Sequence, residues 1–220
     1  MRRKVFGEIL LVALAIALPV SAQQCGPGCP ACSGKSTGDL LPEKTVLATG
    51  LYIPDGEEET AVFNLRYGLF SWMDAGVGYA RDAEELIWSL RVQAIAQDRD
   101  GWRPGLIFGT GSVQTGGSDQ SAYAQLAKTW EIVEGTFGVS VSGGYATDVP
   151  DLKEDWGIGT VSLSLFDRVS PFYTYDGINS HAGLSVFATE WLTLSAYALE
   201  MEDLAIMVGV QLGFGDEERE

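Results

Sequence analysis

Arg66, Asp74 and Arg91 are charged residues on the polar face of three successive segments with an alternating residue pattern. A period of two places all three on the same face of the expected sheet. If that face lines the interior of a barrel, the charges need partners or water. Two hypotheses remain open: a constriction that selects ions in a pore, and a salt-bridged plug that holds a narrow barrel together.

The single histidine, His181, is the only imidazole that could act as a base, as in barrels that resemble outer-membrane phospholipase A. It follows Asn179 and Ser180, but neighbours on a strand point to opposite faces, so Ser180 is poorly placed as a nucleophile. Serines on other expected strands are further candidates: Ser162, Ser164, Ser185 and Ser195. Since no G-x-S-x-G or H-E-x-x-H motif is present, we expect no catalytic residue.

Carboxylates cluster at residues 55–59 and 151–155, where several oxygens could hold a divalent cation. Neither cluster has EF-hand spacing, and solvated loop charge explains both. The glycine-rich stretch 109–117 lacks a lysine and a following helix, so it does not indicate a phosphate loop. We therefore expect no metal and no cofactor.

All three cysteines, Cys25, Cys29 and Cys32, lie in one Gly- and Pro-rich stretch. An odd number permits one disulfide with a free thiol, or an intermolecular bridge. A metal site lacks a nearby fourth ligand. The composition predicts a flexible segment over residues 23–43.

The first 22 residues have the features of a secretory signal peptide. Arg2, Arg3 and Lys4 precede an apolar run over residues 9–20, and residues 20–22 form a cleavage site. The run extends about 18 Å as a helix, too short for a hydrocarbon core of about 30 Å. Because Gln24 precedes Cys25, a lipoprotein is not expected.

The formal net charge of −16 argues against nucleic acid as a partner, because phosphates need Lys and Arg. After residue 22 no stretch is long and apolar enough for a membrane helix. If the protein crosses a membrane, it must do so as a closed barrel.

From about Thr45 onward the dominant period is two, which indicates half-buried strands. One face is apolar, and the other carries Gly, Ser, Thr, Gln, Asn and a few charges. This second face distinguishes a barrel with a polar lumen from a soluble sandwich, whose core is aliphatic. Residues 45–53, 121–130 and 156–165 fit either register.

Connection lengths alternate along the chain. Tight, often aromatic turns are expected at 70–72, 98–102, 166–170 and 189–191. Between them lie longer or more acidic connections at 54–60, 81–85, 113–120, 146–155, 176–180 and 200–203. Short periplasmic turns and longer outer loops are typical of bacterial barrels. Trp72, Trp102 and Trp191 would then form an inner aromatic girdle. The alternative is a soluble meander with random loop lengths.

The last expected strand has alternating apolar residues that end on an aromatic: Ile206, Val208, Val210, Leu212 and Phe214. It resembles the C-terminal assembly signature of bacterial outer-membrane barrels, which implies the barrel assembly machinery as a partner. The chain departs from that signature because an acidic tail, residues 215–220, follows the aromatic.

A looser resemblance rests on PFYTYDGINSHAGL, residues 171–184. An aromatic strand, then Asp176-Gly177 and Asn179 at a turn, then Gly183, looks like uncharacterised outer-membrane barrels associated with exopolysaccharide secretion. The resemblance implies an extracellular polymer as partner and transfers no catalytic residue. Good hairpin chemistry would produce the same residues.

Together these features predict an all-β protein: an antiparallel up-and-down transmembrane β-barrel of about 12 strands over residues 44–214. We expect it in the outer membrane, in contact with lipid. The predicted role is structural or pore-like, in envelope or exopolysaccharide export. A soluble periplasmic β-barrel or sandwich acting as a binding module is the alternative, and a lipid hydrolase is the third hypothesis.

Overall fold

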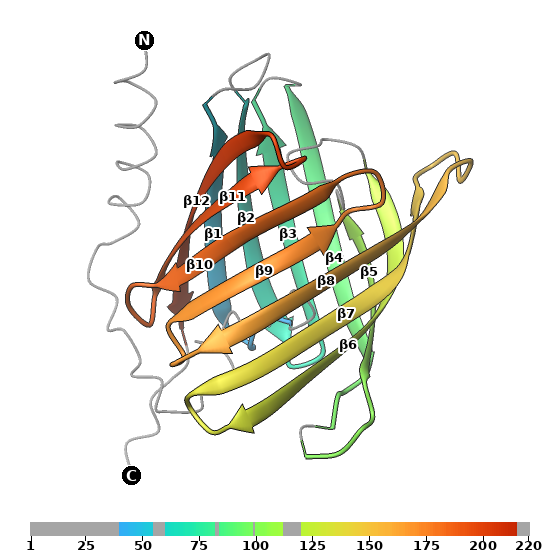
Figure 1. Ribbon diagram of the computed structural model, residues 1–220. Helices are drawn as coiled ribbons and strands as arrows, with labels where there is room; N and C mark the ends of the chain where they lie inside the picture. The colour runs from blue at the N-terminus through green and yellow to red at the C-terminus, as the bar shows by residue number, and fades with distance from the viewer. Residues whose placement is uncertain (1–39, 55–59, 82–83, 99, 112–119, 215–220) are drawn as a thin grey trace.

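Twelve antiparallel strands form one closed barrel (Figure 1). The computed structural model describes residues 40–54, 60–81, 84–98, 100–111 and 120–214. The strands are β1 (Thr45–Ile53), β2 (Thr60–Phe70), β3 (Met73–Ala80), β4 (Glu85–Ile95), β5 (Gly105–Gly111), β6 (Ser121–Val133), β7 (Phe137–Asp148), β8 (Asp155–Leu165), β9 (Val169–Tyr175), β10 (Ser180–Phe187), β11 (Leu192–Leu199) and β12 (Asp203–Gly213). No helix in these ranges is long and apolar enough to cross a membrane.

Every strand pairs with its neighbours in the chain, and the barrel closes where β12 pairs with β1. That seam runs from the Thr45–Gly213 pair to the Tyr52–Ile206 pair. It extends one residue further, since the Phe214 amide donates to the Lys44 carbonyl oxygen at 2.8 Å. Closure gives every strand a neighbouring strand on both sides. The predicted fold class, an up-and-down barrel of about 12 strands, is confirmed.

The two ends of the barrel differ in their connections. We call the end that carries residues 44 and 214 the terminal rim, at the bottom of Figure 1, and the other end the distal rim. Connections at the terminal rim are residues 71–72, 96–104, 134–136, 166–168 and 188–191. Those at the distal rim are residues 54–59, 81–84, 112–120, 149–154, 176–179 and 200–202.

Two features of the terminal rim differ from the sequence prediction. The β4–β5 connection, expected to be tight, spans residues 96–104, and the β6–β7 turn at residues 134–136 was not predicted. The first difference follows from the long strand β6, which continues past the start of β5. The β4–β5 connection lies beside the part of β6 that has no β5 partner. There the Gln97 side-chain oxygen accepts a hydrogen bond from the Thr129 amide.

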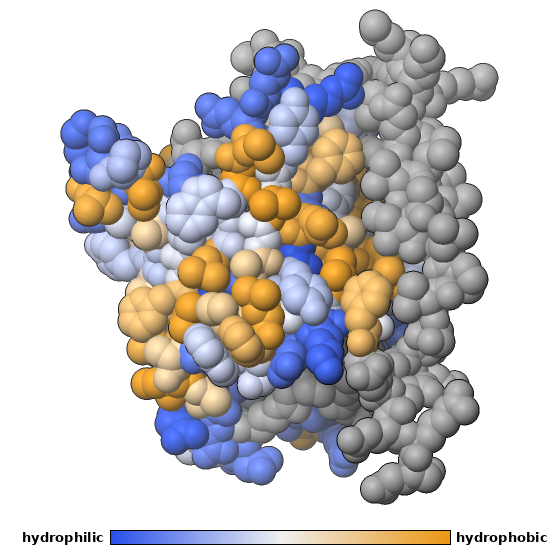
Figure 2. All heavy atoms as spheres, turned by 180° about the vertical axis from the view of Figure 1, so that it is seen from behind, coloured by the Kyte–Doolittle hydropathy of each residue, from blue (hydrophilic) through white to orange (hydrophobic). Residues whose placement is uncertain are grey.

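The outer surface carries a band of large apolar side chains. Exposed examples come from strands all round the barrel: Leu65, Val77, Trp88, Leu126, Val141, Val161, Leu184 and Leu194. In Figure 2 apolar residues gather in the middle of the face shown, and hydrophilic ones prevail at its two ends. Exposed aromatic residues lie near both rims, including Trp72, Trp102 and Trp191 at the terminal rim. A lipid-facing barrel needs this distribution.

The interior is filled on two sides. Near the distal rim an apolar cluster joins β1–β4 to β11 and β12: Leu51, Ile53, Val62, Ala80, Ile87, Tyr197, Leu199 and Ala205. The inner faces of β7, β8 and β9 carry a wall of short hydroxyl side chains, each less than a tenth exposed: Ser140, Ser142, Thr160, Ser162, Ser164 and Ser170. Because small side chains beside an open channel would be wetted, this burial indicates a narrow, occupied lumen.

Candidate functional site

The three charged residues singled out in the sequence meet inside the barrel near the terminal rim. Asp74, the second residue of β3, lies directly opposite Arg91 of β4. Arg66 comes from β2, two residues before Gly68, which is the β2 partner of Asp74. The structure therefore brings all three together on the lumen side.

Asp74 is the centre of this cluster. Arg91 binds it in a bidentate fork, with Nε 3.0 Å from Oδ1 and Nη2 2.6 Å from Oδ2. Arg66 Nε lies 3.4 Å from Oδ1. The Asp74 side chain is fully buried, whereas those of Arg91 and Arg66 are 8% and 29% exposed. Two guanidinium groups thus share one carboxylate.

A tyrosine extends this cluster across the barrel. Asp74, Arg91, Gly109 and Tyr123 are successive cross-strand neighbours on β3, β4, β5 and β6. A Cβ at Gly109 would overlap the Tyr123 ring, so the ring lies over Gly109 on the side of Arg91. Sequence reasoning missed Tyr123, since the register of residues 121–130 was ambiguous.

The main chain at the start of the described residues also reaches Asp74. The Leu41 amide donates to Asp74 Oδ2 at 2.9 Å, and Leu41 itself is buried. Nothing in the sequence indicated this contact, because Leu41 lies in a stretch without periodicity. Asp74 thus accepts hydrogen bonds from β4 and from the chain before β1, and pairs with a cation on β2.

The second polar site is a hydrogen-bonded lock at the distal rim. His181 Nε2 lies 2.8 Å from Asp176 Oδ2, and both side chains are buried. The Glu200 amide donates to His181 Nδ1 at 3.1 Å, and the Asn179 side-chain amide donates to Glu200 Oε1 at 2.6 Å. Asp176 Oδ1 accepts the amides of Ile178 and Asn179. These bonds tie the β9–β10 loop to the β11–β12 loop.

This geometry leaves His181 without a free ring nitrogen. Since Nδ1 accepts a backbone N–H, the proton is on Nε2 and is donated to Asp176. A general base needs a lone pair aimed at a nucleophile. The Ser180 hydroxyl bonds instead to the Tyr173 hydroxyl at 2.7 Å, and the Ser185 hydroxyl bonds to that of Ser195. Ser162 and Ser164 belong to the buried hydroxyl wall.

Packing accounts for the glycines of residues 171–184. Gly177 has a φ of +107°, and a Cβ there would overlap the Trp156 indole. Gly183 lies under Phe172 and Tyr197, whose rings meet edge to face with centroids 5.6 Å apart. The features of this resemblance therefore have structural uses in the hairpin and the barrel interior.

The remaining predicted residues fall in two groups. On β12, Val208, Val210 and Leu212 alternate with lumen-facing residues along the seam with β1, and Phe214 continues the series. The possible disulfide residues Cys25, Cys29 and Cys32 lie outside the described residues, as does the acidic stretch 55–59.

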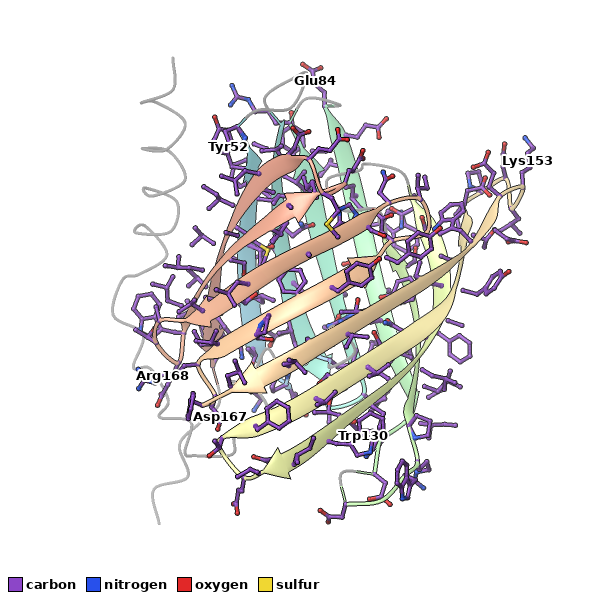
Figure 3. All side chains as sticks on the ribbon, viewed as in Figure 1. Tyr52, Glu84, Trp130, Lys153, Asp167 and Arg168 are labelled. Atoms are coloured by element: carbon purple, nitrogen blue, oxygen red, sulfur yellow. The ribbon has the colours of Figure 1, made fainter. Side chains whose placement is uncertain are left out.

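The β7–β8 loop gives no sign of a cation site. Asp151 pairs with Lys153, which projects at the tip of the loop in Figure 3. Within the ranges that the structure describes, no group of three or more His, Cys, Asp or Glu residues could hold a metal ion.

Known barrels share this architecture. The fold resembles that of the KdgM porin, with a TM-score of 0.53 at 10% sequence identity, over 78% of this chain and 99% of that one. It also resembles the outer membrane protein Omp33 of Acinetobacter baumannii, with a TM-score of 0.50 at 9% identity and the same coverage of both chains. No protein-family model matches the sequence, and neither does any curated protein. The likeness establishes a porin-type barrel fold.

Proposed function

We propose that this protein is an outer-membrane β-barrel of pore-like architecture, with a lumen that is closed in the conformation described here. One observation carries the proposal: a closed barrel presents a band of exposed apolar side chains outward, while the Asp74 cluster and the hydroxyl wall lie inside it. Lipid around the barrel would cover this band. On a soluble protein the same apolar surface would be exposed to water, which is energetically unfavourable.

Three further features support a membrane location. The porin-type fold is one, and the expected signal peptide at residues 1–22 is another. The third is the aromatic side chains near both rims, where amphipathic rings favour the membrane–water interface. Outer-membrane lipid and the barrel assembly machinery are then the expected partners, with Val208, Val210, Leu212 and Phe214 as the assembly signal.

Cell fractionation tests the membrane assignment. The mature protein should sediment with an outer-membrane marker, and its gel mobility should change on boiling because the closed barrel resists unfolding in detergent. Recovery of the whole protein with a soluble periplasmic marker, with no heat-dependent mobility, would overturn the proposal in favour of the binding module.

Conductance separates a pore from a purely structural barrel. Because the Asp74 cluster and the hydroxyl wall fill the lumen, we expect purified protein in planar bilayers to be closed most of the time, with rare openings. Reversing the charge of the more exposed arginine, Arg66→Glu, should shift the ion selectivity of those openings. Bilayers without any openings would leave a structural role.

The hydroxyl wall favours polymer export as a second candidate function. Once the lumen opens, serine and threonine hydroxyls on β7–β9 can exchange hydrogen bonds with the hydroxyls of a sugar chain. The resemblance of residues 171–184 to barrels associated with exopolysaccharide secretion points the same way. Deletion of the gene should reduce extracellular polysaccharide, and the intact gene should restore it. Unchanged secretion would exclude this role.

A further inference from the structure

The chain just before β1 folds back into the mouth of the barrel. Lys44 forms the corner with a φ of +59°. Its amide donates to the Gly68 carbonyl of β2, and its carbonyl accepts the Phe214 amide after β12. A further turn bond joins the Thr45 amide to the Pro42 carbonyl at 3.2 Å. This corner fixes the direction in which residues 40–43 leave β1.

Two contacts hold these residues against the inner wall. The Leu41 amide donates to the fully buried Asp74, and residue Leu41 is 7% exposed. The carbonyl groups of Leu41 and Pro42 lie over Gly68, where a Cβ would overlap both. Since Gly68 pairs with Asp74, it faces the lumen, and only glycine there leaves room for the chain.

We infer that residues 40–43, here called the strap, are a latch that closes the terminal mouth of the barrel and that Asp74 is its catch. The inference rests on the proposed membrane function, and it adds the element that controls passage. Asp74 keeps its two arginines when the strap leaves, so release breaks the Leu41–Asp74 hydrogen bond and exposes Leu41 without dismantling the cluster. The strap can therefore move while the Asp74–arginine pairs and the barrel stay intact.

Gly68→Ala should displace the strap without altering any charge, because its Cβ must enter the space of the Pro42 carbonyl. Gly209→Ala is the matched control: this glycine also faces the lumen, and the nearest atom to its Cβ is 3.6 Å away. Both substitutions add one methyl group to a strand. Heat-dependent gel mobility verifies that each variant still forms a barrel.

Thiol labelling reports the position of the strap. In mature protein with Cys25, Cys29 and Cys32 replaced by serine, Leu41→Cys should react with a membrane-impermeant maleimide about tenfold or more slowly than Glu43→Cys, because a buried site reacts only after local opening. Adding Gly68→Ala should raise the Leu41→Cys rate to that of Glu43→Cys, and adding Gly209→Ala should leave it slow. Planar bilayers should show longer openings for Gly68→Ala alone.

Any one of three results would overturn the latch. The first is labelling of Leu41→Cys as fast as Glu43→Cys in the unaltered barrel. The second is no difference between the effects of Gly68→Ala and Gly209→Ala on labelling. The third is a released strap with unchanged bilayer openings, because the strap would then be seated without closing anything. By contrast, failure of the protein to enter the outer membrane would refute the proposed function and is detected separately by fractionation.

Discussion

Asp74→Asn is the substitution whose effect on stability follows most directly from the structure. The asparagine keeps the volume of Asp74 and one acceptor oxygen but loses the negative charge. Arg91, which is almost fully buried, and Arg66 would then both lose the carboxylate that they share. Breaking a buried ion pair by removal of one partner destabilises a protein by about 3–5 kcal/mol.

Reversible urea unfolding in lipid vesicles, followed by tryptophan fluorescence, measures this change. With an m-value of about 2 kcal/mol per M, a loss of about 4 kcal/mol lowers the urea midpoint by about 2 M. The matched control is Asp151→Asn, which breaks the exposed pair with Lys153 at the tip of the β7–β8 loop. An exposed pair contributes about 0–1 kcal/mol, so this variant should stay close to the parent protein.

A double-mutant cycle then isolates the interaction. In an Arg91→Gln background the Asp74→Asn change should cost less, by about 0.5–3 kcal/mol, because its main buried partner is already neutral. If Asp74→Asn and Asp151→Asn shift the midpoint equally, the cluster is not a buried charge network. If the cycle shows no coupling, the bidentate pair does not contribute as its geometry implies.

Two further substitutions test the outer surface and the distal lock. Val77→Arg places a charge in the middle of the apolar band and should lower the free energy of unfolding in lipid by about 2–4 kcal/mol. The control, Val77→Ala, should have a small effect. Equal effects of the two substitutions would show that Val77 does not face lipid. His181→Ala leaves Asp176 Oδ2 and the Glu200 amide without this partner and should destabilise the barrel by about 1–3 kcal/mol in the same urea assay. Unchanged stability in His181→Ala would show that the lock is not formed, and loss of a lipid-hydrolase activity in that variant would revive the enzyme hypothesis.

The period of two, the small polar residues of the second face and the alternating connection lengths together predicted the fold class, because each strand of a barrel has one face toward lipid and one toward the lumen. It also placed Arg66, Asp74 and Arg91 on one side of the sheet, where the structure brings them within contact. The odd or even position of a residue along its strand tells which face its side chain is on, even when the residues opposite it are not known.

Residues 121–130 were ambiguous for an identifiable reason: Lys128 lies on the outward face of β6, beside the exposed Val141 of β7. Its ammonium bonds to the Asp98 carbonyl of the β4–β5 connection and lies 5.9 Å from the ring centroid of Trp130. A lysine on the outward face breaks the alternation of apolar and polar residues. The β4–β5 connection, which covers this lysine, comes from a different part of the chain and cannot be read from the pattern of β6.

The strap and the distal lock could not be predicted because both depend on contacts between distant segments. Leu41 and Asp74 are 33 residues apart, and His181 and the Glu200 amide are 19 apart. The alternating pattern records which way a side chain points along its own strand. It contains no information about a backbone amide that arrives from elsewhere in the chain.

Lys44 couples closure of the β1–β12 seam to the position of the strap. One residue joins the corner of the strap to Gly68 on β2 and to Phe214 at the end of the seam. We therefore expect the last bond of the seam and the seating of residues 40–43 to form together when the barrel closes. If the strap closes the terminal mouth as proposed, the side wall and that mouth of the barrel close in one step, and a membrane would not leak while the barrel assembles in it.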